Sequence, residues 1–150
     1  MGGCAVKSFN LIRWLLAGLA WAVIIYLFEM VANTAVLGKD WAAFGLITAK
    51  AYPAPDMTLS LVHWGLQALV GGLGGAFIYA ISHAWFGAKM KAGLSAGFLV
   101  WAVGWLGMTF DKMAMGNEPA KMMHINLLFV IAACLLAGVV TTYIYKDKTS

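Results

Sequence analysis

Four long apolar stretches constrain this chain more than any other feature of its sequence. They run over residues 11–38, 58–82, 92–110 and 122–145, and the second contains no Asp, Glu, Lys or Arg. A helix needs about 20 residues to cross roughly 30 Å of hydrocarbon, so each stretch is near the required length. Continuous apolar runs differ from the alternating pattern of a membrane β-barrel. The sequence therefore predicts an all-α integral membrane protein with four transmembrane helices.

The overall composition excludes several other classes of protein. Apolar residues make up 63% of the chain and charged residues 11%, whereas soluble domains average about 45–50% and about 25%. This balance argues against a cytosolic enzyme, a disordered chain and a secreted disulfide scaffold. At about 20 residues per span, four helices use most of the 150 residues. We therefore expect residues 1–150 to form a single four-helix transmembrane domain.

The placement of Lys and Arg predicts the orientation of the helices. Six of these residues fall on one side of the predicted membrane and four on the other. The six are Lys7, Arg13, Lys89, Lys91, Lys146 and Lys148, and the four are Lys39, Lys50, Lys112 and Lys121. Because cytoplasmic loops carry the excess of Lys and Arg, both termini are predicted to be cytoplasmic. Short connections favour an antiparallel up-down bundle, which we expect in a bacterial inner (cytoplasmic) membrane.

The longest predicted connection, residues 39–57, has a mixed character. Its first part contains Trp41, Phe44, Leu46 and Ile47, and Pro53 and Pro55 follow. Apolar and aromatic residues in such a position are typical of a short helix that lies in the membrane interface, and the prolines would end it. The net charge of +4 is interpreted as membrane orientation and lipid contact rather than nucleic-acid binding.

Small residues predict where the helices pack against one another. Apolar side chains gain nothing by leaving lipid for a helix contact, so residues that allow close backbone approach mark the interfaces. The candidate packing positions are glycines of the second, third and fourth spans: Gly71, Gly75, Gly93, Gly97 and Gly138. Gly71 and Gly75 continue a stripe with four-residue spacing that begins at His63 and Gln67.

Polar residues within the spans mark the candidate site. Glu29 interrupts the first stretch, and an acidic residue there costs roughly 2.5–3.5 kcal/mol on insertion scales unless it faces the bundle interior or a partner. Tyr26, Glu29 and Asn33 share one face, and His63 and Gln67 lie at a similar predicted depth in the second span. One interpretation is a proton-accepting or ligand-binding pocket around Glu29 and His63. The other is an interhelical hydrogen bond from Glu29 to His63 or Gln67 that only fixes packing.

Methionine and histidine near the outer membrane face raise a second hypothesis. The sulfur and imidazole donors concerned are Met113, Met115, Met122, Met123, His63 and His124. Thioether and imidazole ligands suit Cu(I), and His63 and His124 could alternatively hold a haem from two helices. Methionine is also a common apolar filler of helix ends, which requires no metal. Copper and haem therefore both stay open as cofactors.

The sequence contains no familiar enzyme signature, such as a nucleophile elbow, a zinc-binding His-Glu-x-x-His or a dinucleotide fingerprint. We therefore expect a non-catalytic accessory or structural subunit of a larger membrane complex, with partner subunits or a second copy as its neighbours. Trp21, Trp101 and Trp105, near mid-membrane, would fill the seam between subunits. The alternatives are a small transporter or channel with a Glu29/His63 pocket, and a redox subunit that carries copper or haem.

Overall fold

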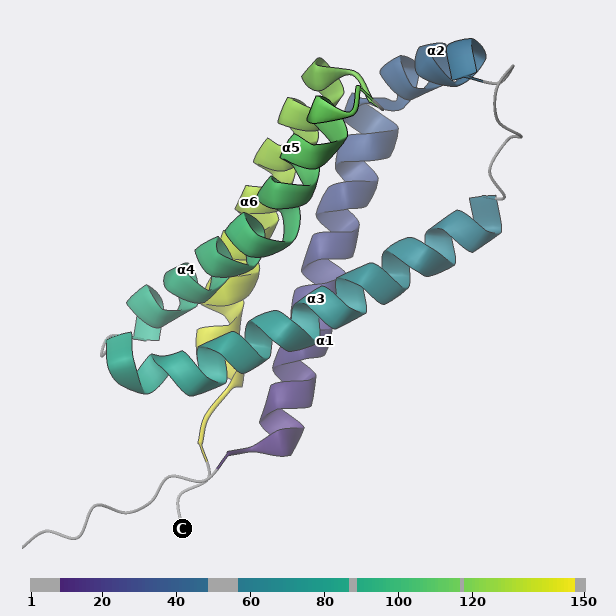
Figure 1. Ribbon diagram of the computed structural model, residues 1–150. Coiled ribbons are helices and arrows are strands. Elements are labelled where there is room, and N and C mark those ends of the chain that lie inside the picture. Colours follow the sequence, from purple (N-terminus) through teal and green to yellow (C-terminus); the bar gives the residue numbers. More distant parts are fainter. Residues whose placement is uncertain (1–8, 49–56, 87–88, 117, 148–150) are drawn as a thin grey trace, which may run out of the picture.

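The computed structural model describes residues 9–48, 57–86, 89–116 and 118–147, and its elements in these ranges are all helical (Figure 1). In chain order they are α1 (Leu11–Met30), the π-helical η1 (Val31–Val36), α2 (Gly38–Thr48), α3 (Met57–Phe86), α4 (Lys89–Val100), the π-helical η2 (Trp101–Leu106), α5 (Gly107–Ala114) and α6 (Ala120–Ile144).

Among the described residues, four continuous helical segments are long and apolar enough to cross a membrane, which confirms the predicted number of helices of this length and polarity. They are Leu11–Val36, Thr58–His83, Lys89–Ala114 and Ala120–Ile144. The predicted third span, 92–110, is too short at both ends, because the first turn of this helical segment contains Lys89 and Lys91 and its last turn contains Asp111 and Lys112. Long Lys side chains can extend from such positions toward water. The predicted first span, 11–38, is too long, since Leu37 separates η1 from α2.

Two polar side chains explain the wider turn at η1. The Asn33 amide donates to the backbone carbonyl of Glu29 at 2.9 Å, and the Thr34 hydroxyl donates to that of Met30 at 2.6 Å. Both side chains thus compete with the backbone N–H groups that an α-helix would use, a competition that commonly bends helices. The Leu37 N–H instead donates to the carbonyl of Ala32 at 2.8 Å. The main helix ends there, and Gly38 begins α2.

A small apolar cluster holds this turn against the start of α6. Its buried members are Leu37, Met122 and Met123, and the half-buried side chains packed on it are Trp41, Met113 and Ile125. The expected short helix between the first two spans is present as α2, but its position in a membrane interface stays a prediction. Pro53 and Pro55, which were expected to end it, lie outside the described residues.

Each of the four membrane-length segments packs against two of the others, so that the contacts form a ring. α1 packs against α3 and α6, while α4 packs against α3 and α6. In Figure 1, α3 crosses α1 obliquely and its amino-terminal half diverges from the other helices. The crossing lies at Gly72, where a Cβ atom would come within 2.5 Å of the Gly18 carbonyl oxygen and 2.7 Å of the Ala22 nitrogen. α3 is therefore fixed at its middle, and the space beside its first turns is left open.

Glycines also set the contact between α4 and α6. A Cβ at Gly93 would lie 2.5 Å from the Gly138 carbonyl oxygen, and one at Gly97 would meet the Cys134 carbonyl oxygen. Gly75 and Gly71 face tryptophans instead: a Cβ would lie 2.6 Å from Trp21 Cζ2 and 3.2 Å from Trp105 Cη2, respectively. All five predicted packing glycines therefore lie against another helix. Gly72, which makes the α1–α3 contact, was not among the predicted packing positions.

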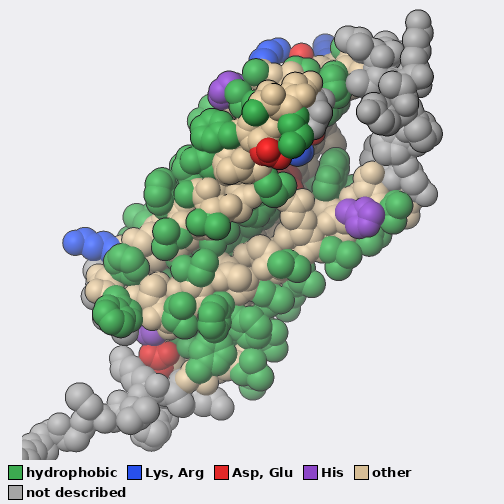
Figure 2. Space-filling model, in the orientation of Figure 1, with side chains coloured by type: hydrophobic (Ala, Val, Ile, Leu, Met, Phe, Trp, Pro, Cys, Tyr) green, Lys and Arg blue, Asp and Glu red, His purple; other side chains and the backbone are tan. Residues whose placement is uncertain are grey.

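Hydrophobic side chains cover most of the face shown in Figure 2, and the charged side chains gather toward its ends. Among the large apolar residues with more than half of their surface exposed are Val70, Val103 and Leu128. Such exposure would be costly in water but is expected for helices surrounded by lipid. The surface therefore agrees with a membrane protein.

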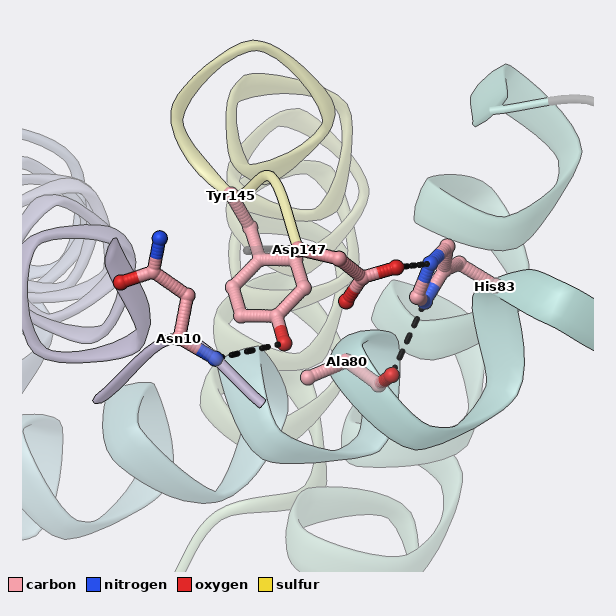
Figure 3. A network of polar contacts seen from close by, with 5 residues as sticks. All are labelled: Asn10, Ala80, His83, Tyr145 and Asp147. Carbon is pink, nitrogen blue, oxygen red and sulfur yellow. Dashed lines mark hydrogen bonds and ion pairs between the residues drawn. The ribbon is translucent and has the colours of Figure 1, made fainter. Parts of the chain in front are cut away.

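A polar network joins three helix ends at one end of the molecule (Figure 3). The Asn10 backbone N–H, before α1, donates to the Tyr145 hydroxyl at 3.5 Å, and His83 Nε2, near the end of α3, lies 3.0 Å from Asp147 Oδ2. His83 Nδ1 lies 2.9 Å from the Ala80 carbonyl oxygen. Both ring nitrogens of His83 are thus within hydrogen-bond distance of an oxygen atom. The contact between His83 and Asp147 was not predicted from the sequence.

Tyr145 gives a testable prediction for this network. Burial raises the pKa of its hydroxyl above the ordinary 10.0; the Asn10 N–H opposes this effect, and the Asp147 carboxylate adds to it. The neutral phenol is therefore favoured in the folded state, so its contribution to stability is present below about pH 10 and is lost as the pH rises through the folded-state pKa. We expect Tyr145→Phe to flatten the alkaline loss of stability.

The measurement is the thermal unfolding midpoint in detergent between about pH 8 and about pH 11. Tyr143→Phe is the matched control, because Tyr143 is 69% exposed on the same helix. Equal alkaline slopes for the two variants would contradict the assignment of Tyr145 to this network.

Candidate functional site

A polar cavity of about 190 Å³ lies beside the amino-terminal half of α3, where that helix diverges from the others. Residues from η1, α2, α3, η2, α5 and α6 contribute to its wall together with Glu29 of α1. The lining residues are Glu29, Asn33, Trp41, Trp64, Gln67, Trp105, Met108, Thr109, Lys112, Glu118, Met123 and Asn126. Figure 2 shows acidic and basic side chains together beside a hollow at this end of the molecule.

Glu29 is the most buried charged side chain of the cavity wall, with 8% of its surface exposed. Its Oε1 atom accepts a hydrogen bond of 3.0 Å from the indole N–H of Trp105 in η2. A buried carboxylate is stabilised by such charge-assisted hydrogen bonds, which are stronger than those between neutral groups. The contact connects the first and third spans through a single pair of side chains.

Asn33 and Trp41 extend the polar wall away from Glu29. The Trp41 indole N–H donates to Asn33 Oδ1 at 2.9 Å, and the Asn33 amide donates to the backbone carbonyl of Glu29. These two bonds occupy the amide oxygen and one amide hydrogen of Asn33. They fix the orientation of its side chain and hold α2 against η1.

Lys112 and Glu118 form an ion pair on the same wall. Lys112 Nζ lies 2.9 Å from Glu118 Oε1, and the Glu118 side chain is 19% exposed. A second pair nearby, Lys121 with Asp40 at 3.2 Å, is more exposed and does not line the cavity. Pairing Lys112 with Glu118 leaves Glu29 without an ion-pair partner among the described residues.

Asn126 supplies an acceptor atom that nothing else uses. Its Oδ1 is buried and has no hydrogen-bond partner among the described residues. Leaving a buried polar atom unpaired costs roughly 1–3 kcal/mol, and such atoms in native proteins usually face water or a ligand. Asn126 lines the cavity, and its unpaired Oδ1 atom is buried within the wall.

Both π-helical segments flank the Glu29–Trp105 contact. η1 follows Glu29 after one residue, and η2 contains Trp105. π-helical turns are rare and occur frequently at functional sites, where they place side chains that an α-helix would direct elsewhere. The presence of two π-helical segments next to the buried Glu29 carboxylate distinguishes this region from the other described parts of the bundle.

The predicted pocket residues divide into two groups. Glu29, Asn33 and Gln67 line the cavity, whereas His63 is an exposed residue outside its lining, and Tyr26 lines a separate groove with Ala22 and Ala68. The Glu29 carboxylate bonds to Trp105 rather than to His63 or Gln67. The proposed pairing of Glu29 with His63 is therefore wrong in the described structure, although the expectation that Glu29 faces the bundle interior agrees with its burial.

Three tryptophans were expected to fill a seam between subunits, and two of them lie inside this chain instead. Trp21 is fully buried and Trp105 is 9% exposed. Trp101 is half-buried and donates to the Leu127 carbonyl at 3.3 Å. The spacing of Trp105 from Trp101 shows that they share a helix face, but the sequence could not reveal that this face meets Glu29.

The described residues give the copper and haem hypotheses no support. They contain no group of three or more His, Cys, Asp or Glu that could hold a metal ion. Met122 and Met123 are buried in the apolar cluster with Met113, whereas His124 and Met115 are exposed. His124 Nδ1 lies 2.7 Å from the Ala120 carbonyl oxygen of its own helix. The burial of Met122 and Met123 in this cluster agrees with the use of methionine as an apolar filler.

No family model, curated protein or solved structure matches this chain.

Proposed function

We propose that this chain is a small transporter or channel of the membrane that binds a small polar solute in the cavity beside Glu29. The observation that carries the proposal is a buried carboxylate in a polar cavity, with Trp105 as its only hydrogen-bond partner among the described residues. Acidic residues within membrane spans commonly mark substrate or ion pathways. His63, outside the cavity lining, has no part in this proposal.

The size of the cavity bounds the solute. A volume of about 190 Å³ is equivalent to roughly six water molecules at about 30 Å³ each. Sites for drug-sized ligands measure about 300–1,000 Å³. The proposed solute therefore has only a few non-hydrogen atoms.

The proposed orientation places both termini in the cytoplasm of a bacterial cell, in an antiparallel up-down bundle. Contacts of Asn10 with Tyr145 and of His83 with Asp147 support the antiparallel arrangement, because they bring the start of α1 to the ends of α3 and α6. The cytoplasmic side is proposed from the excess of Lys and Arg at this end. The cavity residues of α1, α3, α5 and α6 gather at the other end. The Glu29 cavity then lies toward the outer face of the inner membrane.

Cysteine labelling tests this orientation. In a background with Cys4→Ala and Cys134→Ala, we expect Lys121→Cys to react with a membrane-impermeant maleimide on intact cells and Lys91→Cys to remain unlabelled. Both lysines are exposed, so accessibility within the protein does not decide the result. The pattern should reverse in inside-out vesicles. Labelling of Lys91→Cys but not of Lys121→Cys on intact cells would contradict the proposal and place both termini outside.

Solute binding is tested by thermal stabilisation of the purified protein in detergent, because a ligand that binds only the folded state raises its unfolding midpoint. The probes are methylammonium, acetate and acetamide, which are small enough for the cavity and differ in charge. Thr109→Leu should abolish the stabilisation, since Thr109 is 9% exposed and lines the cavity. Ser95→Leu is the matched control, because Ser95 lines a separate groove that shares no residue with the Glu29 cavity.

A probe that stabilises wild type and Ser95→Leu but not Thr109→Leu supports the cavity, and its uptake into proteoliposomes then tests transport. Stabilisation that survives Thr109→Leu, or no stabilisation by any of the three probes, counts against the proposal.

The second candidate is an accessory subunit of a larger membrane complex, and a glycine-lined groove favours it. The groove lies between α3 and the α4–η2 segment, and its wall includes Gly74 and Gly104, where a Cβ would meet nothing within 4 Å. Exposed glycines let a second helix approach closely in lipid. The proposed occupant is a transmembrane helix of a partner subunit.

Crosslinking separates the two candidates. A cysteine introduced at Val103, which is 81% exposed beside the groove, should crosslink to a different protein in native membranes if the chain is an accessory subunit. Isolation of the chain as a monomer that retains solute binding would argue against the subunit role.

A further inference from the structure

The charges around the cavity are unequal. Its lining contains two carboxylates, Glu29 and Glu118, but one ammonium group, that of Lys112. The wall therefore carries one net negative charge when both acids are ionised. Lys112 pairs with Glu118 at 2.9 Å, so the unpaired carboxylate is that of Glu29. A positively charged ligand would neutralise the net charge of the wall, whereas an anion would add to it.

Hydrogen bonding within the wall leaves one oxygen of Glu29 available to a ligand. The indole N–H groups of Trp105 and Trp41 are already donated to Glu29 and Asn33. By contrast, Glu29 Oε2 has no hydrogen bond within the described part of the chain. A ligand that donates a hydrogen bond would pair with this oxygen.

The cavity wall also contains aromatic rings. Trp41, Trp64 and Trp105 all line the cavity, and tryptophan faces attract cations more strongly than the other aromatic rings do. The hydrogen bonds of Trp41 and Trp105 hold two of the rings in place without a ligand. An organic cation can use both the carboxylate and the rings, while a strongly hydrated metal ion gains less from the rings.

We propose that the Glu29 cavity binds a small organic ammonium cation, with the Glu29 carboxylate as its ion-pair partner and the tryptophan rings as its apolar wall. This inference rests on the proposed solute-binding function and names the class of solute. The volume limits the ligand to amines about as large as methylammonium or tetramethylammonium.

The test measures dissociation constants of the full-length protein in detergent for methylammonium, tetramethylammonium, potassium ion, acetate and acetamide, from tryptophan fluorescence and thermal stabilisation. We expect the organic cations to bind at least tenfold more tightly than the other three probes. Glu29→Gln should weaken their binding at least tenfold. Asp40→Asn is the matched control, because Asp40 is an acid at the same end that pairs with Lys121 outside the cavity.

Trp64→Leu provides a second variant should Glu29→Gln fail to fold. Trp64 has no hydrogen bond to another side chain among the described residues and is half-buried. Its loss should weaken tetramethylammonium binding severalfold and leave the unfolding midpoint without ligand nearly unchanged.

The outcomes separate this inference from the function on which it rests. Tighter binding of acetate or acetamide through the same cavity would overturn the cation inference and leave the solute-binding function standing. Equal affinity for potassium ion would overturn the organic nature of the ligand. If no probe binds, both the cation inference and the proposed solute-binding function are wrong.

Discussion

Alanine at Gly138 is expected to destabilise the protein by about 1–3 kcal/mol, toward the upper end of the range for overpacked sites. The added Cβ would collide with the backbone carbonyl oxygen of Gly93, and the Gly97 nitrogen lies 3.2 Å from its position. Backbone atoms cannot rotate away as a side chain can, so α4 and α6 would have to separate along their whole contact. Loss of close packing is costly in lipid, because van der Waals contact is a main source of helix association there.

The measurement is the unfolding free energy in mixed detergent micelles, and Gly74→Ala is the matched control. Gly74 is also helical, but a Cβ there would meet nothing within 4 Å. The control should be neutral or slightly stabilising, since alanine favours a helix over glycine by up to about 1 kcal/mol. If both variants unfold at the same denaturant concentration, α4 and α6 do not approach as closely as described.

Phenylalanine at Trp105 should cost about 1.5–3 kcal/mol, because it removes the hydrogen bond donated to the buried Glu29 carboxylate. The phenyl ring retains much of the apolar surface, so the lost N–H is the main change. Trp101→Phe is the matched control within the same π-helical segment. Its indole donates to the neutral Leu127 carbonyl at 3.3 Å, and loss of that bond should cost about 0.5–1.5 kcal/mol.

A double-mutant cycle isolates the Glu29–Trp105 pair. Once Glu29→Met has removed the carboxylate, Trp105→Phe should cost clearly less than in the wild-type background, because no charged acceptor remains unpaired. Strict additivity of the two substitutions would show that the hydrogen bond does not contribute to stability.

The four spans followed from the sequence because burial in lipid depends on the length and polarity of each segment by itself. Every backbone group of a membrane helix pairs within the same segment, so no knowledge of the neighbours was required. The ends were less accurate: charged residues such as Lys89 and Lys112 belong to the third helix, although sequence patterns assign them to loops.

The candidate site was predictable only in part. Glu29 was identified because an acid within an apolar stretch must find a polar environment inside the bundle. Its partner could not be identified, since His63 and Gln67 were the polar residues at a similar depth and Trp105 was grouped with the apolar residues. The choice among them depends on how η2 turns the third helix and on how far α3 diverges from α1.

The sequence by itself determined the helices, their number and the presence of one costly carboxylate, because hydrophobicity and backbone pairing are local properties. The tertiary structure decided which glycines make contacts, that Trp105 rather than His63 meets Glu29, and that a polar cavity lies beside them. These features depend on the rotation and crossing of helices distant in sequence. Several small residues on each helix permit alternative packings, and only the assembled bundle selects one of them.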